Sequence, residues 1–170
     1  MGAPSDDLTV RITTHPATIW FIRNVASRLD PWVFRATNGR FFSMGKPDMP
    51  MVTLLTRGRR SGRIRPVHLA SIQHEGHAHV VASAMGQERH PGWRYNLEAH
   101  PEVEVQAAGE RYTARAEVLT DAEKSAMWDL VCALIPQIRI YEQRTDRNIR
   151  LFRLRRVAPE SDRAAGVGAA

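Results

Sequence analysis

The stretch that decides the fold runs from Met51 to Gln73 and reads MVTLLTRGRRSGRIRPVHLASIQ. Two apolar runs, Met51–Thr56 and Ile64–Gln73, lie on either side of the segment Gly58-Arg59-Arg60-Ser61-Gly62. Short apolar runs separated by a glycine-containing turn predict a β-hairpin. We therefore expect these two runs to pair as neighbouring antiparallel strands.

Further strand patterns follow this hairpin. We expect strands at His79–Ser83, Val103–Ala107 and Tyr112–Leu119, and a last one at Ile149–Val157, where apolar residues alternate with arginines. Helical patterns cover Pro16–Leu29, a short stretch to Ala36, His90–Ala99 and Asp121–Ile135, the last preceded by the capping-box pair Thr120 and Glu123. Consecutive strands interrupted by one short helix predict a mainly β fold with α elements, an antiparallel barrel with helices packed outside.

The length of 170 residues fits one domain with one hydrophobic core. We expect a flexible N-terminal lead over 1–14, a single domain over 15–157, and a disordered tail over 158–170. Phe41, Phe42 and Met44 are expected to lie across the core. The first residues lack the apolar region of a secretory signal, and Cys132 is the one cysteine. These features predict a cytoplasmic protein.

The charge is basic and comes almost entirely from arginine. Lysine and arginine total 24 against 18 aspartate and glutamate, and only Lys46 and Lys124 are lysines. Arginine recognises phosphate and carboxylate through two parallel hydrogen bonds, so the composition predicts an anionic partner. A nucleic-acid-binding barrel is compatible with this charge. However, Trp93, Trp128 and Phe152 fit packing patterns, which leaves no evident platform for stacking bases.

The segment Arg57–Arg65 is the densest polar motif. Its glycine-flanked turn exposes backbone N–H groups, Ser61 adds a hydroxyl, and Arg59, Arg60 and Arg65 add positive charge. This combination could hold a phosphodiester or a carboxylate. A solvated basic hairpin with no ligand is an equally weighted interpretation.

Two further motifs follow. The small residues of Ala82-Ser83-Ala84-Met85-Gly86 end a strand and would let a flat ligand approach the backbone closely. In His90–Leu97, Trp93 and Leu97 fit core packing, while Asn96 could cap or orient a neighbouring loop.

Other kinds of site find less support. His74, His77 and His79 invite a metal interpretation, but no carboxylate or cysteine completes a convincing spacing, so we expect no metal site. Ser61 and Ser83 lack the Gly-x-Ser-x-Gly context of a hydrolase nucleophile.

Taken together, the motifs resemble the deazaflavin-dependent nitroreductase family of the flavin/deazaflavin oxidoreductase superfamily. The resemblance is carried, in order, by Leu54–Gly62, Arg65, Val81-Ala82-Ser83, Gly86, His90–Trp93, Asn96-Leu97, Pro101–Gln106 and Tyr141–Ile149. It implies a split β-barrel of the FMN-binding type and the cofactor F-420, a deazaflavin with a phosphodiester and a glutamate tail. FMN is the alternative cofactor, and haem is a further possibility, as in related split barrels.

The resemblance also implies roles for individual residues. Arg59, Arg60 and Arg65, with Ser61, would hold the anionic part of the cofactor. The deazaflavin ring would lie against Ala82, Ser83, Ala84, Met85 and Gly86, with Val67 and His68 approaching from the neighbouring strand and Trp93 and Asn96 supporting the pocket. The chain departs from the family at His68, where proline is usual, and at Arg60, where lysine is common.

The implied activity is hydride transfer between the deazaflavin and an activated alkene, a quinone or a nitro compound. Ser83 and Tyr141 are candidates for substrate orientation or proton relay. Ile135 and Ile138 stand where quinone- and nitroimidazole-reducing members have tyrosines, which predicts a more apolar substrate pocket. We expect a hydrophobic small-molecule substrate, no nucleic acid, and at most weak peripheral membrane contact. A non-catalytic cofactor carrier or sensor of the same fold stays open.

Overall fold

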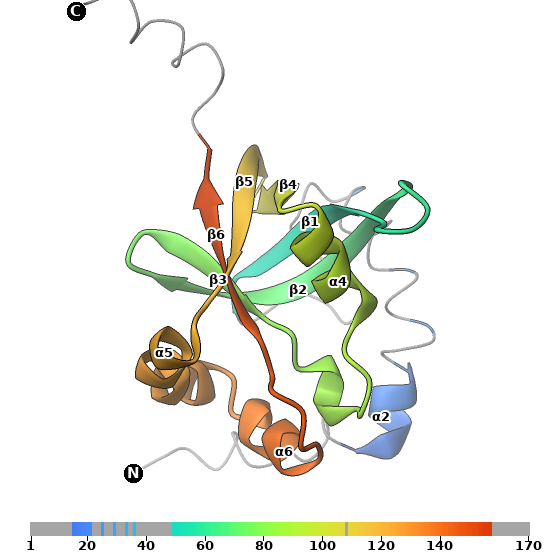
Figure 1. The fold of residues 1–170 in the computed structure, drawn as a ribbon. Coiled ribbons are helices and arrows are strands. Elements are labelled where there is room, and N and C mark those ends of the chain that lie inside the picture. The colour runs from blue at the N-terminus through green and yellow to red at the C-terminus, as the bar shows by residue number, and fades with distance from the viewer. Residues whose placement is uncertain are drawn as a thin grey trace, which may run out of the picture.

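The computed structural model describes residues 15–21, 25, 29, 33, 36, 49–107 and 109–157. Within these, six strands close into one barrel in the order β1-β2-β3-β6-β5-β4, and every neighbouring pair is antiparallel (Figure 1). The strands are β1 (Met51–Arg57), β2 (Ile64–His74), β3 (His77–Val81), β4 (Glu102–Ala107), β5 (Glu110–Val118) and β6 (Leu151–Arg156). The helices are α2 (Pro16–Phe21), η2 (Ala84–Gly86), α4 (Gly92–Ala99), α5 (Asp121–Leu134) and α6 (Gln137–Gln143). The antiparallel barrel expected from the sequence is therefore confirmed.

The β1–β2 hairpin forms where the sequence predicts it. Thr56 pairs with Arg65 and Arg57 with Ile64. The turn between them is closed by the N–H of Gly58 donating to the carbonyl of Arg63 at 2.9 Å, and by the N–H of Gly62 donating to the carbonyl of Gly58 at 2.7 Å. Gly62 has a φ of +64°, a conformation that glycine adopts without steric cost.

One expected strand boundary is wrong, and one helix was not predicted. The strand expected at His79–Ser83 is β3, which ends at Val81 because the chain then turns into η2. A separate helix, α6, follows α5, although the sequence pattern did not predict it. Pro136 ends the run of α5 and stands at the start of α6, since proline is tolerated at a helix start but not inside a helix.

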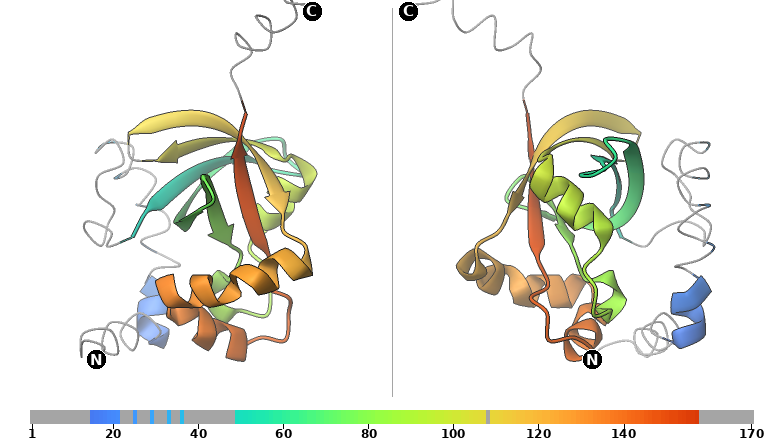
Figure 2. Two further views of the ribbon diagram at one scale, coloured as in Figure 1. Left: turned by 90° about the vertical axis from the view of Figure 1, so that its left-hand side faces the viewer. Right: turned by 45° about the vertical axis from the view of Figure 1, so that its right-hand side comes forward.

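The hydrophobic side chains form two clusters. The first fills the barrel and includes Val52, Leu54, Val80, Trp93 and Phe152, with the Trp93 and Phe152 rings 5.6 Å apart. It confirms core packing for Trp93 and Leu97, which are 9% and 1% exposed. The second lies between the barrel end and α5 and α6, which run beneath that end in Figure 2. α4 instead covers the side of the barrel near β1 and β2 (Figures 1 and 2).

The capping box predicted for α5 is present. The hydroxyl of Thr120 accepts from the N–H of Glu123 at 3.2 Å, and the Glu123 carboxylate accepts from the N–H of Thr120 at 2.9 Å. Most of the predicted N-terminal helix beyond α2, the residues Phe41, Phe42 and Met44, the lead over 1–14 and the tail from Ala158 lie outside the described residues.

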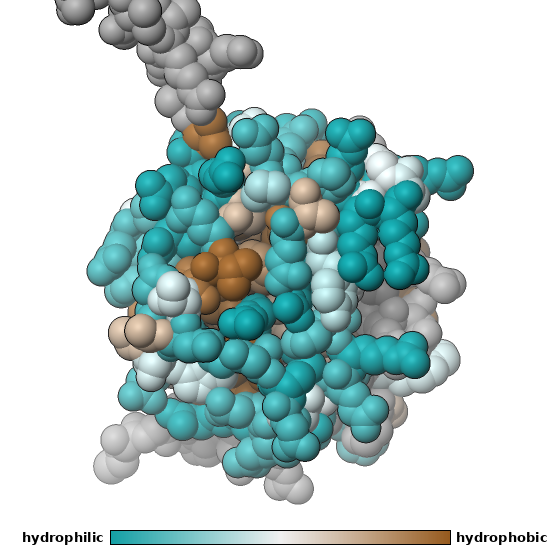
Figure 3. Space-filling view, viewed as in Figure 1, coloured by the Kyte–Doolittle hydropathy of each residue, from teal (hydrophilic) through white to brown (hydrophobic). Residues whose placement is uncertain are grey.

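Hydrophilic side chains dominate the face shown in Figure 3, which also carries one compact hydrophobic patch near the crossing of β3 and β6 in that view. None of the helices described here is long and apolar enough to span a membrane.

Candidate functional site

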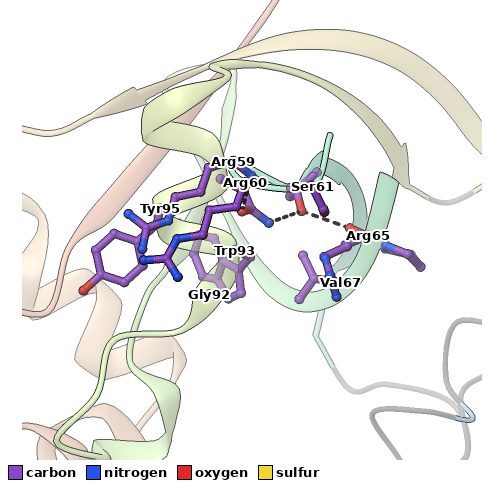
Figure 4. A pocket seen from close by; sticks show the side chains of 12 residues that line it. Arg59, Arg60, Ser61, Arg65, Val67, Gly92, Trp93 and Tyr95 are labelled. Carbon is purple, nitrogen blue, oxygen red and sulfur yellow. Dashed lines mark hydrogen bonds between the residues drawn. The ribbon is translucent and has the colours of Figure 1, made fainter. Parts of the chain in front are cut away.

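A cavity of about 510 Å³ lies between the β1–β2 hairpin and α4 (Figure 4). The hairpin supplies polar and cationic side chains, while β2 and α4 supply apolar and aromatic ones. The lining residues are Thr56, Gly58, Arg59, Arg60, Ser61, Arg65, Pro66, Val67, Gly92, Trp93, Tyr95 and Asn96. Such a cavity is within the size range of small-molecule and cofactor sites.

Asn96 fixes the hairpin to α4. Its side-chain oxygen accepts a hydrogen bond from the backbone N–H of Arg59 at 3.1 Å, and its amide nitrogen donates to the hydroxyl of Thr56 at 3.1 Å. The Thr56 hydroxyl donates in turn to the carbonyl of Arg65 at 3.0 Å. Since Asn96 is only 7% exposed, a buried hydrogen-bond network sets the position of the arginine turn. The expectation that Asn96 orients a neighbouring loop is confirmed.

Two arginines contact the ring of Tyr95. The guanidinium carbon of Arg59 lies 4.6 Å from the ring centroid and that of Arg94 lies 5.0 Å away. Arg94 also pairs with the Glu98 carboxylate at 2.8 Å. Arg59 and Arg60 extend together toward Tyr95, whereas Arg65 and Val67 lie on the other side of Trp93 (Figure 4). The cavity thus has a cationic rim and an apolar floor.

The turn is also compact at Gly58. A methyl group at that position would lie 2.7 Å from the hydroxyl oxygen of Ser61 and 3.2 Å from the carbonyl oxygen of Arg63. A residue with a side chain at this position would therefore displace the Ser61 hydroxyl and press against the Arg63 carbonyl.

The loop Ala82–Gln87 forms a second region, outside this cavity. Ala84, Met85 and Gly86 all have positive φ, of 46°, 55° and 74°. Each non-glycine residue in this conformation costs about 1–2 kcal/mol, so the surrounding structure must hold the loop. One support is α6, because a methyl group on Gly86 would lie 2.9 Å from the carbonyl oxygen of Tyr141.

Arg147 is the other support. Its Nε donates to the carbonyl of Gln87 at 2.7 Å, its Nη1 donates to the carbonyl of Ala82 at 2.9 Å, and its Nη2 donates to the carbonyl of Ser83. Its Nη1 also lies 3.2 Å from Nδ1 of His90. Burial lowers the pKa of this guanidinium from its ordinary value. Arg147 lies within the resembling segment Tyr141–Ile149, but nothing in its spacing indicated which carbonyls it would contact.

Tyr141 and Ile138 lie in the second hydrophobic cluster, at 8% and 2% exposed, and the half-buried Ile135 and Met85 pack against that cluster. Burial raises the pKa of the Tyr141 phenol. His68 lies on β2 behind the cavity, with its Nδ1 2.9 Å from the hydroxyl of Thr53.

The structure thus divides the predicted site residues. It brings Arg59, Arg60, Ser61, Arg65, Val67, Trp93 and Asn96 to one cavity. It does not place His68, Ala82, Ser83, Ala84, Met85, Gly86 or Tyr141 in the lining of that cavity. Thr56, Gly58, Pro66, Gly92 and Tyr95 line it without having been predicted, although all five adjoin or belong to the two motifs that were.

Within the described ranges, no group of three or more histidine, cysteine, aspartate or glutamate residues is arranged to hold a metal ion. His79 is 2% exposed, and its Nδ1 lies 3.2 Å from the carbonyl of His77.

Comparison with known proteins supports one family. The model of the F420H(2)-dependent quinone reductase family matches residues 26–155. An F420H(2)-dependent quinone reductase of Mycobacterium tuberculosis is 32% identical over 118 residues, which cover 66% of this chain and 78% of that protein.

Comparison with solved structures supports the same family. An F420-H2-dependent reductase is 33% identical with a TM-score of 0.57, covering 62% of this chain and 93% of that one. A structure described as a domain-swapped dimer is 29% identical with a TM-score of 0.59, covering 73% and 94%. These findings confirm the split-barrel fold, the enzyme class and the deazaflavin cofactor expected from the sequence. The chain therefore belongs to the F420H(2)-dependent quinone reductase family.

Proposed function

We propose that the cavity between the hairpin and α4 holds the anionic part of F-420. The observation that carries this proposal is the arginine turn fixed by Asn96, which presents Arg59, Arg60 and Arg65 with the Ser61 hydroxyl around one cavity. Guanidinium groups and a hydroxyl are suitable donors for a phosphodiester and carboxylates. The residues present therefore fit this part of the cofactor.

We propose that the flat ring extends from the cavity toward the loop Ala82–Gly86. Val67 and Trp93 give the cavity an apolar wall, and the small side chains of Ser83 and Ala84 would let a ring approach the backbone closely. Ala82 is fully buried and supports the loop from the barrel core. In this arrangement Met85 and Gly86 border the ring, and His68 supports β2 through its contact with Thr53.

The substrate we propose is a hydrophobic quinone or another activated alkene. When bound, the deazaflavin supplies two-electron hydride chemistry, and the protein supplies orientation and exclusion of water. Ile138 and Tyr141 are buried in one cluster, and the half-buried Ile135 and Met85 pack against it. A substrate placed beside the loop would therefore first meet the apolar side chains of Ile135 and Met85. Apolar pockets favour substrates whose polar groups are confined to the reacting end.

Tyr141 and Ser83 are the hydroxyls that we propose for substrate orientation or proton delivery. A tyrosine phenol is protonated at neutral pH, as a proton donor must be, and burial shifts the pKa of Tyr141 further upward, away from neutral pH. The buried position of Cys132 is compatible with the reducing cytoplasm, which we infer as the compartment.

Turnover of reduced F-420 with a panel of acceptors tests this function. We expect oxidation of reduced F-420 by hydrophobic quinones and enones, and slower oxidation by a bicyclic nitroimidazole. Tyr141→Phe should lower kcat more than it weakens F-420 binding. If the protein binds F-420 but turns over none of the acceptors, it is a carrier or sensor. A Tyr141→Phe enzyme with wild-type kcat would remove Tyr141 from the chemistry.

A further inference from the structure

We infer that Arg147 is a positioning residue that joins the loop Ala82–Gln87 to the arginine turn, so that the two halves of the cofactor site are held in one arrangement. This inference rests on the proposed function, because it assumes that both halves contact F-420. Arg147 itself comes from the segment between α6 and β6 and lines no part of the cavity.

The first step is the contact of Arg147 with the loop. Three nitrogens of one guanidinium donate to the carbonyls of Ala82, Ser83 and Gln87, which lie at both ends of the turn. A planar guanidinium presents several donors in a fixed geometry, whereas a lysine ammonium is a single compact charge on a flexible stem. Arg147 therefore sets the distance between the two ends of the loop in a way that lysine would not reproduce.

The second step is the conformation that this contact preserves. Three successive residues, Ala84 to Gly86, have positive φ, and two of them are not glycine. The N–H of Gly86 donates to the Ser83 carbonyl at 3.0 Å, and Arg147 donates to the same oxygen. Without Arg147, the loop loses the donors that compensate for its unfavourable backbone.

The third step links the loop to the arginine turn. Because an arginine N–H can only donate, the contact of Nη1 with His90 makes Nδ1 of His90 the acceptor. The His90 ring then meets the Tyr95 ring edge-on, with centroids 6.0 Å apart at 90°. The guanidinium carbon of Arg59 lies over the Tyr95 ring, 4.6 Å from its centroid. A continuous line of contacts thus runs from the loop through Arg147, His90 and Tyr95 to Arg59.

The test compares Arg147→Ala and Arg147→Lys with Arg150→Ala. Arg150 lies three positions along the same segment, and its guanidinium pairs with Asp121 at 3.4 Å. Its backbone carbonyl accepts the N–H of Ala82, a bond that alanine keeps, so Arg150→Ala removes an equal charge without removing a contact to the loop. The hydrogen-exchange rates of the Ala82–Gln87 amides in the ligand-free protein measure how firmly the loop is held. F-420 affinity and kcat measure the effect on the cofactor site.

We expect faster exchange in both Arg147 variants, and a loss of kcat of about tenfold or more, since several charge-assisted hydrogen bonds are removed. Without additives, Arg147→Lys should behave like Arg147→Ala. Guanidinium ion added at millimolar concentration should partly restore the kcat of Arg147→Ala but not that of Arg147→Lys or wild type. Arg150→Ala should match wild type. A purely structural role would lower the melting temperature without any rescue of kcat by guanidinium.

Three results would overturn the inference. One is unchanged loop exchange in Arg147→Ala. Another is wild-type F-420 affinity and kcat in a variant whose loop exchanges faster. The third is full activity in Arg147→Lys, which would reduce the effect to charge. If wild-type protein fails to bind F-420, the proposed function is wrong and this inference is wrong with it. If wild-type protein binds F-420 and one of the three results above is found, only this inference is wrong.

Discussion

At the scale of single residues, Asn96 decides the geometry of the cavity. Replacing it with leucine removes both of its hydrogen bonds and leaves the buried Thr56 hydroxyl without its donor. An unmade buried hydrogen bond costs about 1–3 kcal/mol. We expect Asn96→Leu to lower the free energy of unfolding by about that amount, and to weaken F-420 binding further because the arginine turn loses its anchor.

Asn96→Asp provides the matched comparison for this prediction. It keeps an acceptor for the N–H of Arg59 but places a negative charge beside the expected position of the cofactor's anionic groups. Binding should therefore fall more in Asn96→Asp than in Asn96→Leu when both are measured by fluorescence titration at low salt. Equal affinity in the two variants would show that the anionic groups lie elsewhere.

Two histidines give the stability a predictable pH dependence. Burial lowers the pKa of His79, and burial together with the neighbouring Arg94 and Arg147 lowers that of His90. Because both pKa values are depressed on folding, the folded state binds fewer protons than the unfolded state just below pH 6.5. The free energy of unfolding should then be greatest above about pH 7 and fall as the pH drops through about 6.5 toward the folded-state values.

Denaturant titrations between pH 5.5 and 7.5 measure this slope in a range above the titration of ordinary carboxylates. The double variant His79→Gln with His90→Gln should show a flatter profile than wild type. A profile that is flat in wild type, or equally steep in the double variant, would contradict the assignment.

At the scale of elements, Gly86 marks the contact between η2 and α6. Its φ is +74°, and a methyl group there would lie 2.9 Å from both the Tyr141 carbonyl oxygen and Cβ of Arg144. Gly86→Ala should therefore lower the free energy of unfolding by about 2–4 kcal/mol, combining a backbone cost with a steric one.

Gly76→Ala separates these two costs. Gly76 has a φ of +75°, but a methyl group there meets nothing within 4 Å, so this variant should lose only about 1–2 kcal/mol. Thermal and denaturant unfolding of the two variants measure the difference. Similar losses in both would show that α6 does not pack against the loop in solution.

Sequence patterns located the elements better than the contacts between them. The glycine-flanked turn predicts the β1–β2 hairpin because its signal is local, and Thr120 with Glu123 predicts the start of α5 for the same reason. In contrast, Asn96 contacts Arg59 across 37 residues of sequence, and Arg147 contacts Ala82 across 65. Such contacts follow from barrel closure. The end of β3 at Val81 depends on backbone conformations at Ala84 and Met85 that non-glycine residues seldom adopt.

At the scale of the whole molecule, side-chain contacts join segments that are far apart in the sequence: Asn96 of α4 bonds to the arginine turn, and Arg147, after α6, contacts His90 just before α4. The net charge of +6 supplies a general attraction for anions, but several arginines among the described residues pair with carboxylates on other elements. Arg153 and Arg155 pair with Glu117, and Arg156 pairs with Glu110 at 2.7 Å. What distinguishes Arg59, Arg60 and Arg65 is therefore their common cavity rather than their charge alone.

The account's central claim is that this cavity binds the anionic part of F-420. Its most direct test is titration of the protein with F-420 and with FMN at low and high salt, in wild type, in Arg59→Ala with Arg60→Ala, and in Arg111→Ala with Arg115→Ala. The last pair lies on β5 outside the cavity lining and removes the same charge. We predict that F-420 binds more tightly than FMN, that only the hairpin variant loses affinity, and that this loss shrinks as salt rises, since partly exposed ion pairs are screened. Equal or tighter binding of FMN, or an unchanged affinity for F-420 in the hairpin variant at low salt, would contradict the claim.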